Sequence, residues 1–265
     1  MKLITIPFGA GGLGRTVGTE YAPEAILTEL KAISLNEQGV KPEFKQEAVA
    51  VDQANISGTN QAIVEHLLQN DEMPVILGGD HSISYACFTA VARKFQRPGL
   101  VVFDAHPDCE HDFSPPTHED FVRVLISEGV VKPEQVILVG LRSWHQNEHE
   151  FISRNKIKHF TMREIALEGL SEVADALMSA ALPWGATYVS VDIDVLDPAF
   201  APGTGYPEAG GLTTRELLYF IQRLARLRNV RAFDLVEINP SLDRTGLTVK
   251  AGAKLVAELF QRTLP

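Results

Sequence analysis

Residues 100–108 read Leu-Val-Val-Phe-Asp-Ala-His-Pro-Asp, an apolar run that ends abruptly in two acids and a histidine. A short apolar run without polar alternation is typical of a parallel strand that is buried on both faces. Asp104, His106 and Asp108 follow at i, i+2 and i+4, so an extended backbone would project all three side chains to one side. Charged groups at a buried strand end are costly unless they are paired or bound to metal. The stretch therefore predicts a buried strand that leads into a metal site.

Similar runs recur along the chain and alternate with segments of helical periodicity. Such alternation is typical of an α/β fold. We expect a single three-layer domain over residues 1–265, with an about eight-stranded, mainly parallel sheet and helices on both faces. The predicted strands are Lys2–Pro7, Glu47–Val51, Pro74–Leu77, Gly99–Asp104, Gln135–Val139, Lys158–Phe160, Thr187–Asp192 and Arg231–Val236. The predicted helices are Pro23–Ile33, Asn60–Leu68, Ile83–Phe95, Glu119–Glu128, Glu148–Asn155, Leu170–Ala180, Arg215–Arg226 and Lys250–Thr263.

Composition narrows the class of protein. Apolar residues make up 45% and charged residues 22%, an ordinary globular composition that argues against disorder. The net charge of −10 disfavours nucleic acid and anionic membranes as partners. Cys87 and Cys109 give no disulfide framework, and no window approaches the roughly 18 apolar residues of a membrane span. We therefore expect a cytoplasmic enzyme.

A glycine-rich segment, Gly9–Gly14, follows the first predicted strand. Gly9, Gly11 and Gly14 match the spacing of the dinucleotide fingerprint, but no convincing helix follows, and no acidic residue ends a second strand about 20 residues on. The sequence favours a flexible active-site loop here. The long loop Asp197–Thr214, rich in proline and glycine, is also expected to be functional.

Three more predicted strands end in residues able to take part in chemistry. Asp192 and Asp194 stand where the strand Thr187–Asp192 ends, His81 follows the glycine turn after residues 74–77, and Glu237 follows the last strand. Alone, an Asp-x-Asp pair or a Gly-Gly-Asp-His turn is more often a solvated turn. Together they converge at the carboxyl edge of a parallel sheet, where α/β proteins place their sites. Asp and His without Cys suit manganese better than structural zinc.

At these residues the sequence resembles a known family. The motifs are GGDHS at residues 78–82, DAHPD at 104–108, DIDVLDP at 192–198 and GTGYPEAGGLT at 203–213. Their combination resembles the ureohydrolases, which comprise arginases, agmatinases and relatives. The resemblance implies an arginase-like fold, a homo-oligomer (trimer or hexamer) and two Mn²⁺ ions per chain. The resemblance implies six metal ligands. His81 and Asp108 would bind one ion, and His106 and Asp194 would bind the other. Asp104 and Asp192 would bridge the two ions.

The resemblance also implies a reaction. A metal-bridging hydroxide would attack the guanidinium carbon of a small guanidino substrate and release urea and an amine. Glu237 would bind and orient the guanidinium, and His118 would shuttle protons, which suits an imidazole. Three residues depart from the family pattern and are expected to line the substrate pocket: Ser143, Trp144 and Tyr206.

These departures leave the substrate open. The short spacing from Asp108 to His118 resembles agmatinases, which favours an agmatine-like substrate over arginine. The alternatives are a substituted guanidine or formimino compound, such as hydroxyarginine, a guanidino acid or formiminoglutamate. Two further alternatives are a single-zinc deacetylase of similar fold and a non-catalytic guanidino-binding protein.

Overall fold

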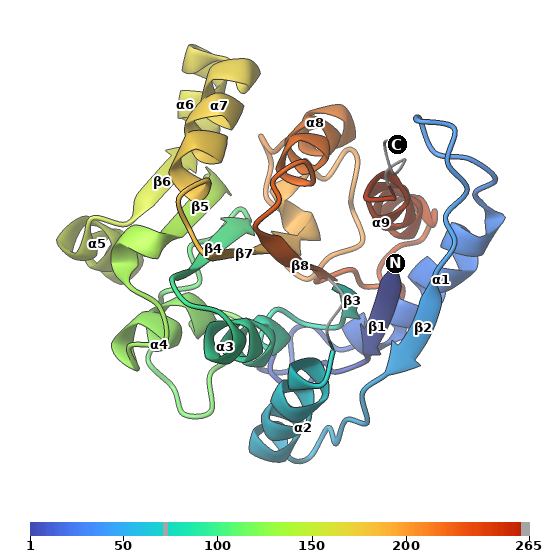
Figure 1. The fold of residues 1–265 in the computed structure, drawn as a ribbon, viewed down its shortest axis with the longest axis horizontal. Helices are drawn as coiled ribbons and strands as arrows, with labels where there is room; N and C mark the ends of the chain where they lie inside the picture. Colours follow the sequence, from blue (N-terminus) through green and yellow to red (C-terminus); the bar gives the residue numbers. More distant parts are fainter. Residues whose placement is uncertain (71–73, 261–265) are drawn as a thin grey trace.

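The computed structural model describes residues 1–70 and 74–260 and contains one sheet in which all strand pairs are parallel (Figure 1). In spatial order its eight strands are β2 (Lys45–Ala48), β1 (Lys2–Ile6), β3 (Pro74–Gly78), β8 (Val230–Val236), β7 (Ala186–Asp192), β4 (Pro98–Phe103), β5 (Val136–Leu141) and β6 (Lys158–Thr161). Because every pair is parallel, the carboxyl ends of all eight strands lie at one edge of the sheet. The predicted α/β sheet is confirmed, and it is parallel throughout.

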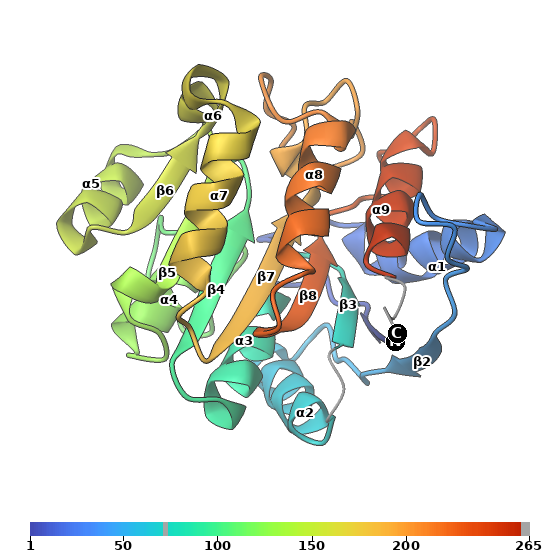
Figure 2. The same cartoon turned by 45° about the horizontal axis from the view of Figure 1, so that its top comes forward.

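Helices cover both faces of the sheet and bury two separate apolar cores. The first core involves α1 (Ala22–Ala32), α6 (Met162–Glu168), α7 (Leu170–Ala181), α8 (Thr214–Leu224) and α9 (Leu247–Glu258). Figure 2 shows α7, α8 and α9 side by side over this face. The second core involves α2 (Ile56–Leu68), α3 (Ile83–Lys94), α4 (Phe121–Ser127) and α5 (Gln146–Asn155).

The apolar strands need both cores. In β4, Val101 and Phe103 belong to the first core, whereas Leu100 and Val102 belong to the second. Successive side chains of a strand point to opposite faces. In a strand that is buried on both faces, every position therefore favours an apolar residue. This is why residues 100–103 lack the alternation of apolar and polar side chains.

The predicted elements differ from the observed ones at a few places. Strand β2 lies at the sheet edge and starts two residues earlier than predicted, because its side chains are mostly exposed and give no clear pattern. Helix α6 was not predicted, although Thr161 and Glu164 form the capping box that begins it. The last three residues of the predicted helix Lys250–Thr263 lie outside the described residues.

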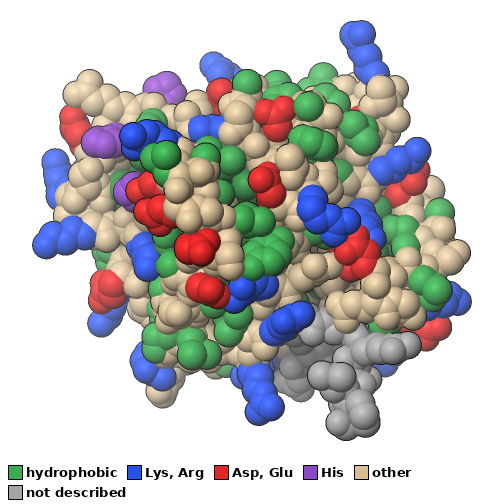
Figure 3. All heavy atoms as spheres, turned by 90° about the horizontal axis from the view of Figure 1, so that it is seen from above, with side chains coloured by type: hydrophobic (Ala, Val, Ile, Leu, Met, Phe, Trp, Pro, Cys, Tyr) green, Lys and Arg blue, Asp and Glu red, His purple; other side chains and the backbone are tan. Residues whose placement is uncertain are grey.

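The surface seen in Figure 3 carries basic and acidic side chains interspersed rather than gathered by sign. A basic stripe, the usual signature of nucleic-acid binding, is therefore missing from this face. Among the helices of residues 1–70 and 74–260, none combines the length and the apolar composition that a membrane span requires.

Candidate active site

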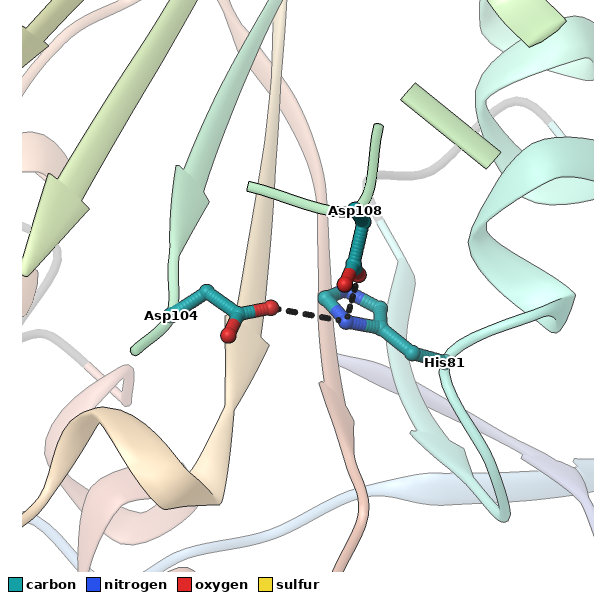
Figure 4. A group of neighbouring side chains, drawn as sticks. All are labelled: His81, Asp104 and Asp108. Carbon is teal, nitrogen blue, oxygen red and sulfur yellow. Dashed lines mark ion pairs between the residues drawn. The ribbon is translucent and has the colours of Figure 1, made fainter. Parts of the chain in front are cut away.

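Three side chains meet where β3 and β4 end. The Nδ1 atom of His81 lies 3.1 Å from Oδ2 of Asp104 and 2.9 Å from Oδ2 of Asp108 (Figure 4). All three atoms are buried and have no hydrogen-bond partner. Buried polar atoms are normally satisfied, so three unsatisfied atoms that converge on one point fit the binding of a cation.

A second group shares a residue with the first. The Nδ1 atom of His106 lies 3.0 Å from Oδ2 of Asp194 and 3.4 Å from Oδ1 of Asp104. The carboxylate of Asp104 thus faces His81 with one oxygen and His106 with the other. Asp192 completes the arrangement, because its Oδ2 lies 3.3 Å from Nδ1 of His81. The structure brings the six predicted ligands together. Five of them form two groups that share Asp104, each of which could hold a metal ion, and Asp192 lies against the first group.

The charges of this cluster are unbalanced. Burial lowers the pKa of the His81 imidazole, but the carboxylates of Asp108, Asp104 and Asp192 outweigh burial and raise that pKa well above its ordinary value. Burial and the neighbouring carboxylate of Asp194 raise the pKa of Asp192. Four buried aspartates around two histidines leave excess negative charge, which divalent cations would neutralise.

A hydrogen-bonded chain orients His81. Its Nε2 lies 2.8 Å from Oγ of Ser190, and Ser190 Oγ donates to Oδ1 of Asp234 at 2.6 Å. Asp234 also accepts from the hydroxyl of Tyr188. With Nε2 engaged in this way, Nδ1 is left to face the carboxylates, which is how proteins fix metal-binding imidazoles. Sequence reasoning missed Ser190 and Asp234; the only available signal was a polar residue inside a buried strand.

The backbone between Asp104 and Asp108 is not the extended segment that the sequence predicted. The last paired residue of β4 is Phe103, which lies opposite Val139 and Val191. Beyond it, Asp104 and Ala105 still form main-chain hydrogen bonds with β5 and the residues after it, but the strand has ended and Asp108 adopts a left-handed φ of 52°. The i, i+2, i+4 projection was therefore wrong in its geometry: Asp104 and Asp108 reach His81 through a bent loop.

Glu237 and His118 lie beside this cluster. Glu237 Oε1 accepts from the main-chain N–H of His81 at 2.8 Å and lies 3.2 Å from Nδ1 of His118. The other oxygen, Oε2, is buried without a partner. Burial lowers the pKa of His118, but the Glu237 carboxylate outweighs burial and raises it to about 9. His118 is buried rather than a surface residue. Its main-chain N–H donates to the main-chain oxygen of Gly11, and this bond brings the glycine-rich loop to the site.

Tyr206 closes over both histidines. Its ring centroid lies 5.6 Å from that of His118 and 5.9 Å from that of His106. Its hydroxyl donates to Oε1 of Glu119 at 3.0 Å and accepts from Arg15 at 3.1 Å. The tyrosine therefore links three loops across the mouth of the site.

A cavity of about 320 Å³ opens onto these groups. Its lining includes all three residues predicted to line a pocket: Ser143, Trp144 and Tyr206. It also includes residues that sequence reasoning missed: Glu110, Glu119, His145, Glu148, Thr204 and Glu208. Of these, Thr204 and Glu208 lie in the loop that was predicted to be functional, whereas the others carried no local signal.

Comparisons with known proteins agree with this geometry. The family model described as "Arginase family" matches residues 1–261. An arginase of Staphylococcus aureus (strain COL) is 30% identical, over 94% of each chain. An agmatinase of Bacillus subtilis (strain 168) is 35% identical over 74% of this chain and 66% of its own. The crystal structure of formimidoylglutamase from Bacillus subtilis subsp. subtilis str. 168 superposes with a TM-score of 0.91 at 26% identity, over 97% of this chain and 85% of its own.

The match spans almost the whole chain, and arginases and an agmatinase stand among the relatives. Members of the family are metal-dependent hydrolases that act on guanidino carbon–nitrogen bonds. By its sequence and by its fold, this chain belongs to the arginase family.

Proposed function

We propose that residues 1–265 form a binuclear manganese hydrolase that cleaves a guanidinium C–N bond of a small guanidino compound, releasing urea or a urea analogue and an amine. One observation carries the proposal: two groups of buried or half-buried ligands share Asp104, and the unpartnered Oε2 of Glu237 lies beside them. The six proposed ligands are His81, Asp104, His106, Asp108, Asp192 and Asp194.

Two ions bound there would lower the pKa of a shared water and so supply a nucleophile at neutral pH. Glu237 would bind the guanidinium through its free Oε2, since a carboxylate and a guanidinium form strong charge-assisted hydrogen bonds. His118 holds Nδ1 toward Glu237, while its buried Nε2 has no hydrogen-bond partner. With a pKa near 9 the imidazole is protonated at neutral pH, so it can donate a proton to the leaving amine.

An agmatine-like substrate is favoured, and the relatives define the alternatives. Arginine is the competing guanidine, and the structural likeness to a formimidoylglutamase makes formiminoglutamate a second alternative substrate. Hydroxyarginine and guanidino acids are the remaining alternative substrates. A single-zinc deacetylase accounts poorly for two ligand groups around one shared aspartate.

The test is hydrolysis by manganese-loaded protein across arginine, agmatine, guanidinobutyrate, hydroxyarginine and formiminoglutamate. Urea, hydroxyurea and formamide are measured separately, with Asp192→Asn as the inactive blank and Asp175→Asn, which changes an exposed aspartate, as the matched control. We expect two manganese ions per chain in the parent protein. We expect turnover by the parent protein and by Asp175→Asn, and none by Asp192→Asn. One zinc per chain, or full activity in Asp192→Asn, would refute the binuclear assignment. Ligand binding by loaded protein without turnover of any compound would indicate a guanidino-binding protein.

A further inference from the structure

The outer half of the cavity is acidic. Among the described residues that line it there is no lysine or arginine. Each aspartate of the lining is one of the six proposed metal ligands, and Glu237 faces His118. Of the four other glutamates in the lining, Glu148 is buried, and its carboxylate accepts from the main-chain N–H groups of Cys109 and His145. The remaining three are more exposed and would face a substrate's far end: Glu110, Glu119 and Glu208.

Glu208 is held most firmly in a position to contact a ligand. Its main-chain oxygen accepts from Nη2 of Arg142 at 2.7 Å and from Nε at 3.2 Å. Its carboxylate oxygen Oε1 accepts from the hydroxyl of Ser143 at 3.1 Å and lies 3.9 Å from Nε2 of His106. The side chain is 41% exposed. The backbone is thus fixed while the carboxylate remains open to the cavity.

The cations near the outer wall are already paired. Arg15 lies in the adjoining cavity, where it donates to the Tyr206 hydroxyl and interacts with the negative charge of Glu119. His145 Nε2 lies 3.7 Å from a carboxylate oxygen of Glu110. Neither group pairs with Glu208. The His106 imidazole does approach the Glu208 carboxylate, but Nε2 lies 3.9 Å away, beyond hydrogen-bond distance, while Nδ1 faces Asp194. The Glu208 carboxylate therefore remains able to pair with a cation on the substrate.

We propose that Glu208, positioned by Ser143, determines specificity by binding a cationic group at the far end of the substrate. The substrates would then be guanidines with a second positive charge and no carboxylate. A carboxylate-ended guanidine would face three glutamates without a basic partner, which penalises its binding. This inference rests on the proposed function, since it concerns the far end of the same substrate.

Two guanidines of matched length test the proposal: agmatine (4-guanidinobutylamine), which ends in an amine, and 4-guanidinobutyrate, which ends in a carboxylate. We expect the manganese-loaded enzyme to prefer the amine by at least about tenfold in kcat/KM, because one charge-assisted pair is gained and one repulsion avoided. Glu208→Gln should raise KM for the amine about tenfold with little change in kcat, and should leave the butyrate unchanged or improved. Glu134→Gln, on an exposed helical turn, is the control.

A binding measurement separates this inference from the proposed function. Calorimetry on loaded protein compares butane-1,4-diamine with 4-aminobutyrate, and Glu208→Gln should remove the preference for the diamine. If neither guanidine is cleaved but the diamine preference depends on Glu208, the reaction is wrong and the subsite stands. A preference for the carboxylate-ended compounds, or an unchanged preference in Glu208→Gln, overturns the inference. A loss of carboxylate-ended substrates in Arg15→Gln would do the same, because it would show that Arg15 binds their far end.

Discussion

Arg142 donates from Nη2 to the main-chain oxygen of Asp194 at 2.6 Å. The same guanidinium donates to the main-chain oxygens of Leu196 and Glu208. One side chain therefore fixes both the turn that carries a proposed metal ligand and the loop that carries Glu208. A planar guanidinium can serve several carbonyls at once, whereas an ammonium cannot reproduce that fork.

Arg142→Lys should lower the free energy of unfolding of the metal-free protein by about 2 kcal/mol, because hydrogen bonds from a charged donor are lost. It should also weaken manganese binding, since the turn around Asp194 loosens. Urea unfolding with chelator and calorimetric titration of manganese check the two effects. Arg163→Lys, which changes an exposed arginine, is the control. Unchanged stability in Arg142→Lys would mean that the carbonyls are equally well satisfied without the guanidinium.

Ser190→Ala should weaken manganese binding roughly ten- to a hundredfold, as is usual when the partner of a metal-binding histidine is removed. The reason is that Nε2 of His81 loses its 2.8 Å partner and the ring is free to turn. Manganese affinity is measured by equilibrium dialysis, with Ser171→Ala on the surface as the matched change. An affinity equal to that of the parent protein would show that packing alone orients His81.

Tyr206→Thr should change the ratio of kcat/KM between bulky and small guanidines by about tenfold, because removal of the ring widens the cavity beside His106 and His118. Manganese content should stay the same. Tyr206→Phe separates the ring from the hydroxyl that bonds to Glu119, and Tyr21→Thr serves as an exposed control. The same substrate ranking in all variants would exclude Tyr206 from specificity.

The Glu37 carboxylate should make the free energy of unfolding depend on pH in the acidic range. The bidentate hydrogen bond from Arg215, with Lys254 nearby, lowers the pKa of the Glu37 carboxyl to about 2, from about 4.5 in the unfolded chain. A lowered pKa adds stability above pH 4.5, and that stability is lost as the pH falls toward 2. Glu37→Gln should therefore be less stable at pH 7 by about 1 kcal/mol at most, given the exposure of the pair. The difference between the two free energies of unfolding should shrink as the pH falls from 4.5 toward 2; a constant difference would contradict the pair.

The sequence predicted the sheet and the meeting of its strand ends because both depend on local patterns. Apolar runs predict parallel strands, and parallel strands place their ends together, so His81 and Asp192 could be expected to meet although they are far apart in the chain. The left-handed turn at Asp108 could not be predicted, since it lies in a loop beyond the last paired residue of β4. Ser190 and Glu208 were missed for another reason: their partners, His81 and Ser143, come from distant segments.

Two acidic residues of the site, Asp108 and Glu237, have φ angles of 52° and 62°, a conformation that suits glycine best. Both residues also bury a carboxylate, which costs free energy until a cation is bound. Glycine at Asp108 would relieve strain and remove that charge at once, so the metal-free chain should become more stable as it loses a proposed metal ligand. At this position selection for stability and selection for metal binding favour different residues.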